Sequence, residues 1–165
     1  MSMARKICML GDFGVGKTSL VARFVRSTFA EKYLTTVGVK VDSKDVRLPS
    51  GDTVKLVVWD IAGRSSLDAP GAQYLRGAAG LLLVADGTRE QSLGAALNLL
   101  MQSRAVLPDA VVALALNKFD LVERWEVAAS TLAQLRRSLP VFQTSALTGD
   151  GVESAFANIA ARLTA

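Results

Sequence analysis

One eight-residue segment carries glycines and a lysine at a spacing that could bind phosphate. Residues 11–18 read GDFGVGKT and fit the pattern G-x-x-x-x-G-K-[ST]. Glycines let the backbone wrap closely around phosphate oxygens, so that several N–H groups point at the anion. Lys17 would bridge the outer phosphates, and Thr18 would offer its hydroxyl to Mg²⁺. The alternative is a chance glycine-rich turn.

A second segment, NKFD at residues 117–120, could read a nucleotide base. A carboxylate such as Asp120 accepts both N–H donors on the Watson–Crick edge of guanine, whereas adenine presents a ring-nitrogen acceptor there. Each buried polar group left unpaired costs about 1–3 kcal/mol. Asn117 could tie the loops together and contact the base, and the aliphatic stem of Lys118 could cover the face of the base. By itself, such a tetrapeptide is a common accident in a loop, so its place in the fold matters.

Both segments follow short apolar runs that are typical of buried strands. Residues 7–10 precede the glycine-rich loop, and residues 110–116 precede Asn117. Residues 80–85 form a third run that is apolar at nearly every position, as expected for strands covered on both faces of a mostly parallel sheet. Ligands bind such sheets at the carboxyl ends of the strands. The two segments therefore lie where a ligand would be bound.

The remaining elements indicate the architecture. Helical spacing predicts helices over residues 19–25, 91–106, 124–139 and 152–163. The helix at 124–139 carries a stripe that we expect to be buried: Trp125, Val127, Ala128, Leu132 and Leu135. Residues 39–48 and 53–59 flank the turn signal PSGD and suggest a hairpin. Together these elements predict an open, doubly wound α/β sheet with one antiparallel hairpin.

Composition excludes several function classes. The 165 residues, of which 50% are hydrophobic and 21% charged, predict a single domain over residues 1–165. The longest apolar stretches fall far short of the roughly 20 residues that cross a bilayer, and no secretory signal is evident, so we expect a cytoplasmic protein. One cysteine and 0 His exclude disulfide scaffolds, zinc sites and histidine triads. The net charge of +4 is scattered, which favours a solvated surface over a nucleic-acid partner.

From about residue 4 to residue 163, the chain resembles the Ras superfamily of small GTPases, most closely the Rab and Ras type. Five ordered motifs carry the resemblance: GDFGVGKT at 11–18, Thr36 within YLTTVGV, WDIAGR at 59–64, NKFD at 117–120 and TSAL at 144–147. The resemblance implies a P-loop NTPase fold, with a six-stranded, mostly parallel sheet, one antiparallel strand and helices on both faces. It also implies a switch that binds GTP, hydrolyses it to GDP with Mg²⁺ as cofactor, and works with a protein effector, an exchange factor and an activating protein.

The resemblance also implies a role for each matching residue. The candidate nucleotide-binding residues are Phe13, Gly14, Val15, Gly16, Lys17, Thr18, Ser19, Phe29, Tyr33, Thr36, Gly63, Asn117, Lys118, Asp120, Ser145, Ala146 and Leu147. Thr18, Thr36 and, through water, Asp60 are the candidate Mg²⁺ ligands, and the candidate catalytic residues are Lys17, Thr36, Gly63 and Arg64.

Within that set, Phe29 is expected to stack on guanine, Tyr33 to close over the phosphates, and the Gly63 amide to sense the γ-phosphate. Residues 25–39 would form a first switch, and the loop from residue 63 through 73 a second. Surface residues of the two switches are expected to meet the effector, among them Lys40, Leu67, Tyr74 and Leu75.

Two departures from the family pattern fall on the hydrolytic machinery. Arg64 stands where a water-orienting glutamine is usual. Arg64 has three interpretations. It is a solvated residue in a mobile loop, or it disables hydrolysis, or it supplies a positive charge in cis to the transition state. A well-placed arginine of the last kind is worth about 10³ to 10⁵ in rate. Phe13 stands where a small residue is usual, and its ring either crowds the γ-phosphate and an incoming arginine finger or folds outward over the nucleotide.

Two further departures lie elsewhere. Leu147 replaces a common lysine, and the loss of that stem weakens packing near the base. The sequence ends in ARLTA without a prenylation cysteine, and Ser2 follows Met1, so no lipid anchor is expected. The leading hypothesis is a slow GTPase switch. The alternatives are a non-hydrolysing GTP-binding scaffold, which Phe13 and Arg64 support, and an ATP-dependent enzyme, which conflicts with NKFD.

Overall fold

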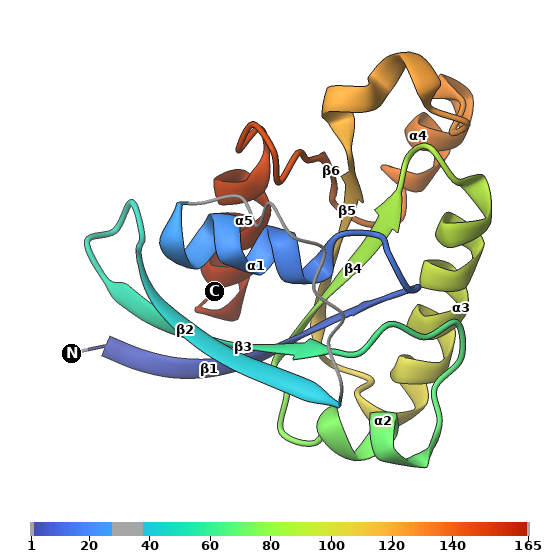
Figure 1. The fold of residues 1–165 in the computed structure, drawn as a ribbon. Helices are drawn as coiled ribbons and strands as arrows, with labels where there is room; N and C mark the ends of the chain where they lie inside the picture. Colours follow the sequence, from blue (N-terminus) through green and yellow to red (C-terminus); the bar gives the residue numbers. More distant parts are fainter. Residues whose placement is uncertain (1, 28–37, 165) are drawn as a thin grey trace.

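The structure is a computed structural model and describes residues 2–27 and 38–164. At its centre lies a six-stranded sheet with the order β2-β3-β1-β4-β5-β6 (Figure 1). Its strands are β1 (Ser2–Gly11), β2 (Val39–Arg47), β3 (Thr53–Ile61), β4 (Gly80–Asp86), β5 (Val111–Asn117) and β6 (Val141–Gln143). β2 runs antiparallel to β3, and every other neighbouring pair is parallel. The predicted mostly parallel sheet with one antiparallel strand is confirmed.

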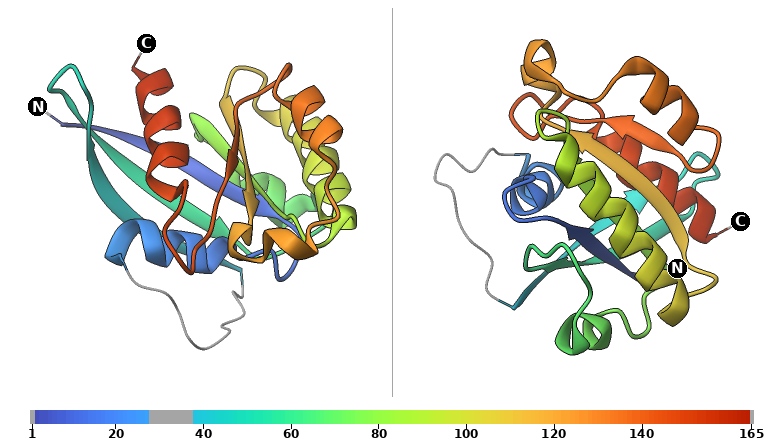
Figure 2. Two further views of the ribbon diagram at one scale, coloured as in Figure 1. Left: turned by 90° about the horizontal axis from the view of Figure 1, so that it is seen from above. Right: turned by 90° about the vertical axis from the view of Figure 1, so that its right-hand side faces the viewer.

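Helices cover both faces of this sheet, as predicted. They are α1 (Lys17–Arg26), α2 (Ala69–Tyr74), α3 (Glu90–Val106), α4 (Ala129–Leu135) and α5 (Val152–Leu163), with a 3₁₀ helix at Phe119–Arg124. α1 and α5 lie on one face, and α3 and α4 lie on the other (Figure 2). Within residues 2–27 and 38–164, no helix combines the length and the apolar character needed to span a membrane.

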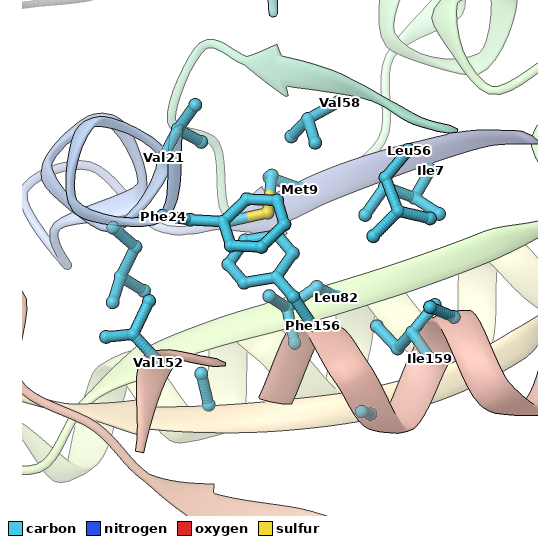
Figure 3. Close-up of a cluster of buried hydrophobic side chains, with 14 of the residues drawn as sticks. Ile7, Met9, Val21, Phe24, Leu56, Val58, Leu82, Val152, Phe156 and Ile159 are labelled. Atoms are coloured by element: carbon cyan, nitrogen blue, oxygen red, sulfur yellow. The ribbon is translucent and has the colours of Figure 1, made fainter. Parts of the chain in front are cut away.

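Each face of the sheet has its own hydrophobic core because successive side chains of a strand point to opposite faces. In β1, Ile7 and Met9 pack toward α1 and α5, whereas Cys8 and Leu10 pack toward α3. The first core includes an aromatic pair in which Phe24 of α1 stacks on Phe156 of α5, with ring centroids 3.9 Å apart (Figure 3). The strands are thus fixed from both sides, and so are the loops at their carboxyl ends.

The helix predicted over residues 124–139 is largely wrong. The chain is extended at Trp125, and α4 spans only Ala129–Leu135. The backbone N–H of Glu126 donates to the carbonyl of Gly87 at 2.8 Å, and this long-range bond takes the segment out of a helical path. The expected stripe is half-buried rather than buried, and its member Ala128 is exposed.

Other elements differ in extent. β1 begins at Ser2, earlier than the predicted Ile7, because it pairs with β3 along this stretch. The six-residue α2 and the three-residue β6 were not assigned from the sequence, since neither is long enough to show a period.

Candidate functional site

The glycine-rich loop joins β1 to α1 at the carboxyl end of β1. Gly14 and Gly16 adopt left-handed backbone conformations, with φ of 77° and 102°, which side chains other than glycine rarely allow. Gly16 is also the N-cap of α1, and a Cβ on it would overlap the side-chain amide of Asn117. A glycine loop that ends at a helix N-terminus is a ready-made site for an anion.

Lys17 is buried beside this loop. Its Nζ donates to the carbonyl oxygens of Gly11 and Asp12, at 3.1 Å each. Burial lowers the pKa of Lys17 to about 8; the carboxylates of Asp60 and Asp12 oppose this shift, and the charge of Arg64 adds to it. An anion beside Lys17 would favour the charged ammonium and would be bound by it.

Thr18 and Asp60 bring two oxygen ligands together. Thr18 Oγ1 donates to Asp60 Oδ2 at 2.6 Å, and Asp60 is buried at the end of β3. Hydroxyl and carboxylate oxygens suit Mg²⁺, which is usually bound by one or two protein ligands together with substrate phosphates. Across residues 2–27 and 38–164, no group of three or more His, Cys, Asp or Glu could hold a metal ion. The hydroxyl and carboxylate oxygens of Thr18 and Asp60 fit a Mg²⁺ site that phosphate completes.

Asn117 connects the glycine-rich loop with the loop after β6. Its Nδ2 donates to the Val15 carbonyl at 3.0 Å, and its Oδ1 accepts from Thr144 Oγ1 at 3.1 Å. Asn117 and Thr144 are both buried, so these bonds are shielded from water. The carboxyl ends of β1, β5 and β6 are held together at this point.

Asp120 and Lys118 are also fixed by neighbouring elements. Ser145 Oγ donates to Asp120 Oδ1 at 2.7 Å. Lys118 has a left-handed backbone with φ of 69°, its carbonyl accepts from Trp125 Nε1 at 2.9 Å, and its Nζ lies 2.9 Å from Asp86 Oδ2. The NKFD segment is thus oriented from both sides before any base is bound.

Hydrogen bonds from Arg23 of α1 hold the rest of the TSAL loop. Arg23 donates from Nε to the Ala146 carbonyl at 2.9 Å and from Nη2 to the Leu147 carbonyl at 2.7 Å. Ala146 is buried, whereas the Leu147 side chain is exposed. Ser19 lies half-buried in the first turn of α1.

Gly63 packs directly against the glycine-rich loop. A Cβ on Gly63 would lie 2.6 Å from the Cα of Phe13, so only glycine fits this approach. The backbone N–H of Arg64 donates to the Gly11 carbonyl at 3.0 Å. The loop after β3 is therefore in contact with the residues that would surround the outer phosphates.

The Arg64 side chain is directed toward α2. Its Nε donates to the Ala62 carbonyl at 3.0 Å, and its Nη1 lies 2.6 Å from Asp68 Oδ1. Asp68 is the N-cap of α2 and accepts from the Gly71 N–H at 2.8 Å. The Arg64 side chain is only 14% exposed, so the interpretation of Arg64 as a solvated residue is wrong. Its guanidinium organises the loop between β3 and α2.

Other expectations have mixed outcomes. Phe13 is 54% exposed, which favours the outward position of its ring. Leu75 has an exposed fraction of 0% and cannot meet an effector in this arrangement, because it is part of the core beneath α3. Lys40 is exposed, and Leu67 and Tyr74 are half-buried. The candidates Phe29, Tyr33 and Thr36 lie outside the described residues.

Sequence reasoning missed Asp86 and Arg89. Asp86 is the last residue of β4, lies opposite Asn117 in the β4–β5 register, and is buried against Lys118. Its place at a strand's carboxyl end was the signal that could have found it. Arg89, just before α3, donates to the Phe13 carbonyl at 2.8 Å, and nothing local in the sequence points to that contact.

Comparison with known proteins assigns the family. The model of the Ras family matches residues 6–165. This chain belongs to the Ras family of small GTPases. The expected class of molecule, a small GTPase that switches with bound guanine nucleotide, is therefore confirmed.

Three relatives illustrate the extent of the similarity. Ras-related protein Rab-4 of Dictyostelium discoideum is 38% identical over 155 residues, which cover 92% of this chain and 75% of that protein. Ras-related protein RABA2d of Arabidopsis thaliana is 37% identical over 162 residues, or 96% and 74% of the two chains. Ras-related protein Rab-4B of Rattus norvegicus is 39% identical over 155 residues, or 92% and 72%.

Proposed function

We propose that this small GTPase acts as one domain that binds GTP tightly and hydrolyses it slowly until an activating protein completes its site. The observation that carries the proposal is the arrangement of Arg64. Its guanidinium bonds to the Ala62 carbonyl and to Asp68 within the loop that packs on the glycine-rich segment. The glycine-rich loop and the contacts of Asn117 and Asp120 support nucleotide binding, whereas Arg64, at the position that would orient water, is engaged with Ala62 and Asp68.

Guanine is the base that the site suits. Asp120 presents a carboxylate already held by Ser145 at 2.7 Å, and its remaining acceptor capacity matches the two N–H donors of guanine. Lys118, oriented by Asp86 and Trp125, would cover the face of the base with its stem. An adenine nucleotide would leave this carboxylate badly paired, at a cost of about 1–3 kcal/mol.

Lys17, Thr18 and Asp60 would serve the phosphate end. Lys17 would exchange its bonds to the loop carbonyls for the outer phosphates. Thr18 and Asp60 would hold Mg²⁺, together with Thr36 of the first switch. When bound, the metal would neutralise charge on the β- and γ-phosphates.

The reaction would be in-line attack of water on the γ-phosphorus. The new bond joins the water oxygen to phosphorus, the bond to the β–γ bridging oxygen breaks, and GDP leaves with that electron pair. The γ-phosphoryl group leaves as inorganic phosphate, which keeps one proton of the water, and the other proton is released to solvent. Lys17 and the loop N–H groups stabilise the charge that develops on the γ-phosphoryl oxygens. Gly63 packs against Phe13 of the phosphate-binding loop, and its amide would contact the γ-phosphate.

Slow hydrolysis follows from the chemistry of Arg64. A guanidinium carries five N–H donors and no acceptor, so it cannot accept a hydrogen bond from the attacking water. Two of its nitrogens are also committed to Ala62 and Asp68. The ordering of the two switches by GTP would still create a surface for an effector, with Lys40 and Tyr74 among its residues.

A second candidate function is a GTP-binding scaffold that does not hydrolyse. It is favoured by the same engaged Arg64, because nothing in that arrangement orients a water for attack. The two candidates differ only in turnover, so one assay separates them.

The experiment has two stages. Chromatography of the denatured, purified protein should show guanine nucleotide, and ATP should fail to displace it in competition. Single-turnover hydrolysis with Mg²⁺ should then show slow conversion of GTP to GDP, and Arg64→Gln should be faster by about tenfold or more. Displacement by ATP would contradict the guanine assignment, and retention of intact GTP by the wild type would establish the scaffold.

A further inference from the structure

We propose that Arg89 is a positioning residue of the phosphate-binding loop. Its Nη2 donates to the Phe13 carbonyl at 2.8 Å, its Nη1 lies 3.9 Å from Asp12 Oδ2, and its Nε lies 3.4 Å from Asp86 Oδ2. One guanidinium thus connects the start of α3 with two successive residues of the glycine-rich loop. The inference rests on the proposed function in that it takes guanine nucleotide to be the ligand.

The contact with Phe13 bears on the direction of the loop peptides. The C=O and N–H of one trans peptide point in opposite directions, so a peptide whose N–H points at a phosphate turns its carbonyl outward. An outward carbonyl can be held there by a donor that approaches from outside the loop, and Arg89 is such a donor for Phe13. Because the donor is charged, the bond is stronger than one between neutral groups.

The contact with Asp12 bears on charge. The Asp12 carboxylate accepts from the Phe13 N–H at 2.8 Å and so lies next to the loop that would hold a polyanion. A carboxylate there repels phosphate, and the repulsion is smaller when a cation lies near the carboxylate. Arg89, at 3.9 Å, is that cation.

The contact with Asp86 fixes Arg89 itself. Asp86 is buried and accepts from the N–H of Thr88 at 2.8 Å and from its Oγ1 at 2.6 Å, and it pairs with Lys118 at 2.9 Å. Burial alone would raise the pKa of Asp86, but the hydrogen bonds from Thr88 and Lys118 hold the pKa below its usual value. The carboxylate therefore stays ionised at neutral pH.

Asp86 also makes the link between the two ends of the site. The same carboxylate holds Lys118 of the base-reading segment and Arg89 of the phosphate-loop contact. Arg89 can therefore position the glycine-rich loop relative to the base. Its removal should increase the rate at which nucleotide is released.

The test measures nucleotide release directly. Each protein is loaded with a fluorescent GDP, chased with excess unlabelled GDP in Mg²⁺ buffer, and followed by the fall in fluorescence. Arg89→Ala should release GDP about tenfold faster, the effect of losing one hydrogen bond from a charged donor. Arg89→Lys keeps the charge but lacks the planar set of donors, so it should fall between Arg89→Ala and the wild type.

Arg104→Ala is the matched control. Arg104 lies in the last turn of the same helix and donates to a backbone carbonyl, that of Ala110, at 3.0 Å. Its removal should leave GDP release unchanged. Urea unfolding of each variant, followed by circular dichroism, supplies the readout for stability, and the midpoint of Arg89→Ala should stay close to that of Arg104→Ala.

The inference is overturned if Arg89→Ala releases GDP at the wild-type rate, or if Arg104→Ala accelerates release equally. It is also overturned if Arg89→Ala lowers the urea midpoint, or fails to fold, while Arg89→Lys folds and shows no faster release. A wild-type protein that holds no guanine nucleotide would instead contradict the proposed function, and with it this inference.

Discussion

The base-reading region and the hydrolytic region of this protein are built differently. Around Asn117, hydrogen bonds connect segments from β1, β5 and β6, and they hold the side chains that we propose to read guanine. Around Gly63, the loop contacts the phosphate-binding segment closely, yet Arg64 is directed toward Asp68. The first region is held by bonds between separate loops, whereas the Arg64 side chain of the second is engaged within its own loop.

This difference teaches that binding and turnover are carried by separate sets of contacts. Asp120 and its partner Ser145 belong to the loops after β5 and β6, whereas Arg64 and Asp68 belong to the segment between β3 and α2. A change in one set should therefore leave the other largely unaffected. Substitution of Asp120, a change of pH and substitution of Asp68 should affect these two sets of contacts differently.

The largest effect is expected from Asp120→Asn. The variant keeps the size of the side chain but replaces a carboxylate acceptor by an amide, so it loses the charge-assisted bonds to guanine. Two such bonds contribute roughly 3–6 kcal/mol, which predicts GDP binding weaker by 100-fold or more. Competition titration against a fluorescent nucleotide measures it. Unchanged affinity for GDP would mean that Asp120 does not read the base.

An intermediate effect is expected from pH, through Lys17. The free protein has a Lys17 pKa of about 8, and bound phosphate would raise that pKa. Above pH 8, binding must therefore take up a proton, so the affinity for GDP should be constant below pH 8 and about tenfold weaker at pH 9 than at pH 7. Isothermal titration in two buffers of different ionisation enthalpy measures both affinity and proton uptake.

The lowered pKa of Lys17 also affects folding, in the opposite direction: it makes the free energy of unfolding rise with pH while the affinity for GDP falls. The unfolded chain, with a Lys17 pKa of 10.5, binds more protons between pH 8 and 10.5 than the folded chain does. This difference makes the free energy of unfolding rise with pH between about pH 8 and 9. Above pH 9 the buried thiol of Cys8, whose pKa is raised from 9.0 to about 12, acts in the opposite direction and offsets the rise. The chain has 0 His, so no imidazole titrates between pH 7 and 9. An affinity that stays constant to pH 9 would show that the pKa of Lys17 is not lowered.

The smallest effect is expected from Asp68→Asn. Asparagine is as good an N-cap as aspartate, so α2 should keep its cap while Arg64 loses its ionic partner. Held by a neutral amide oxygen in place of a carboxylate, the guanidinium should leave this contact more often and so become available to stabilise charge on the γ-phosphate. Single-turnover hydrolysis should therefore rise about two- to fivefold. GDP release should not change. A slower reaction, or a change in GDP release alone, would count against this role for Asp68.

Much of the fold could be predicted because its signals are local. The apolar runs that became β4 and β5, and the turn signal PSGD between β2 and β3, are properties of short segments. The start of α4 could not be predicted because hydrogen bonds to other segments set it. Trp125 bonds to the carbonyl of Lys118, and Glu126 bonds to the carbonyl of Gly87, which is far away in the sequence. Tertiary contacts there outweigh the helical spacing of the side chains.

In the candidate site, too, residues within local motifs could be predicted, whereas residues defined by tertiary contacts could not. Lys17, Asn117 and Asp120 stand in motifs whose spacing is itself the signal. Arg64 was singled out from its motif, but its partner Asp68 was not, because both lie in an irregular loop where spacing does not indicate which side chains meet. Arg89 reaches the Phe13 carbonyl across 76 residues of chain, and only the folded arrangement reveals it.

The central claim is that binding and turnover can be separated, and one paired measurement tests it most directly. GDP release and single-turnover GTP hydrolysis are measured on the wild type, Arg64→Gln and Asp120→Asn. We expect faster hydrolysis with unchanged GDP release for Arg64→Gln, and much faster GDP release for Asp120→Asn. Equal hydrolysis by the wild type and Arg64→Gln, or a parallel change in GDP release, would contradict it.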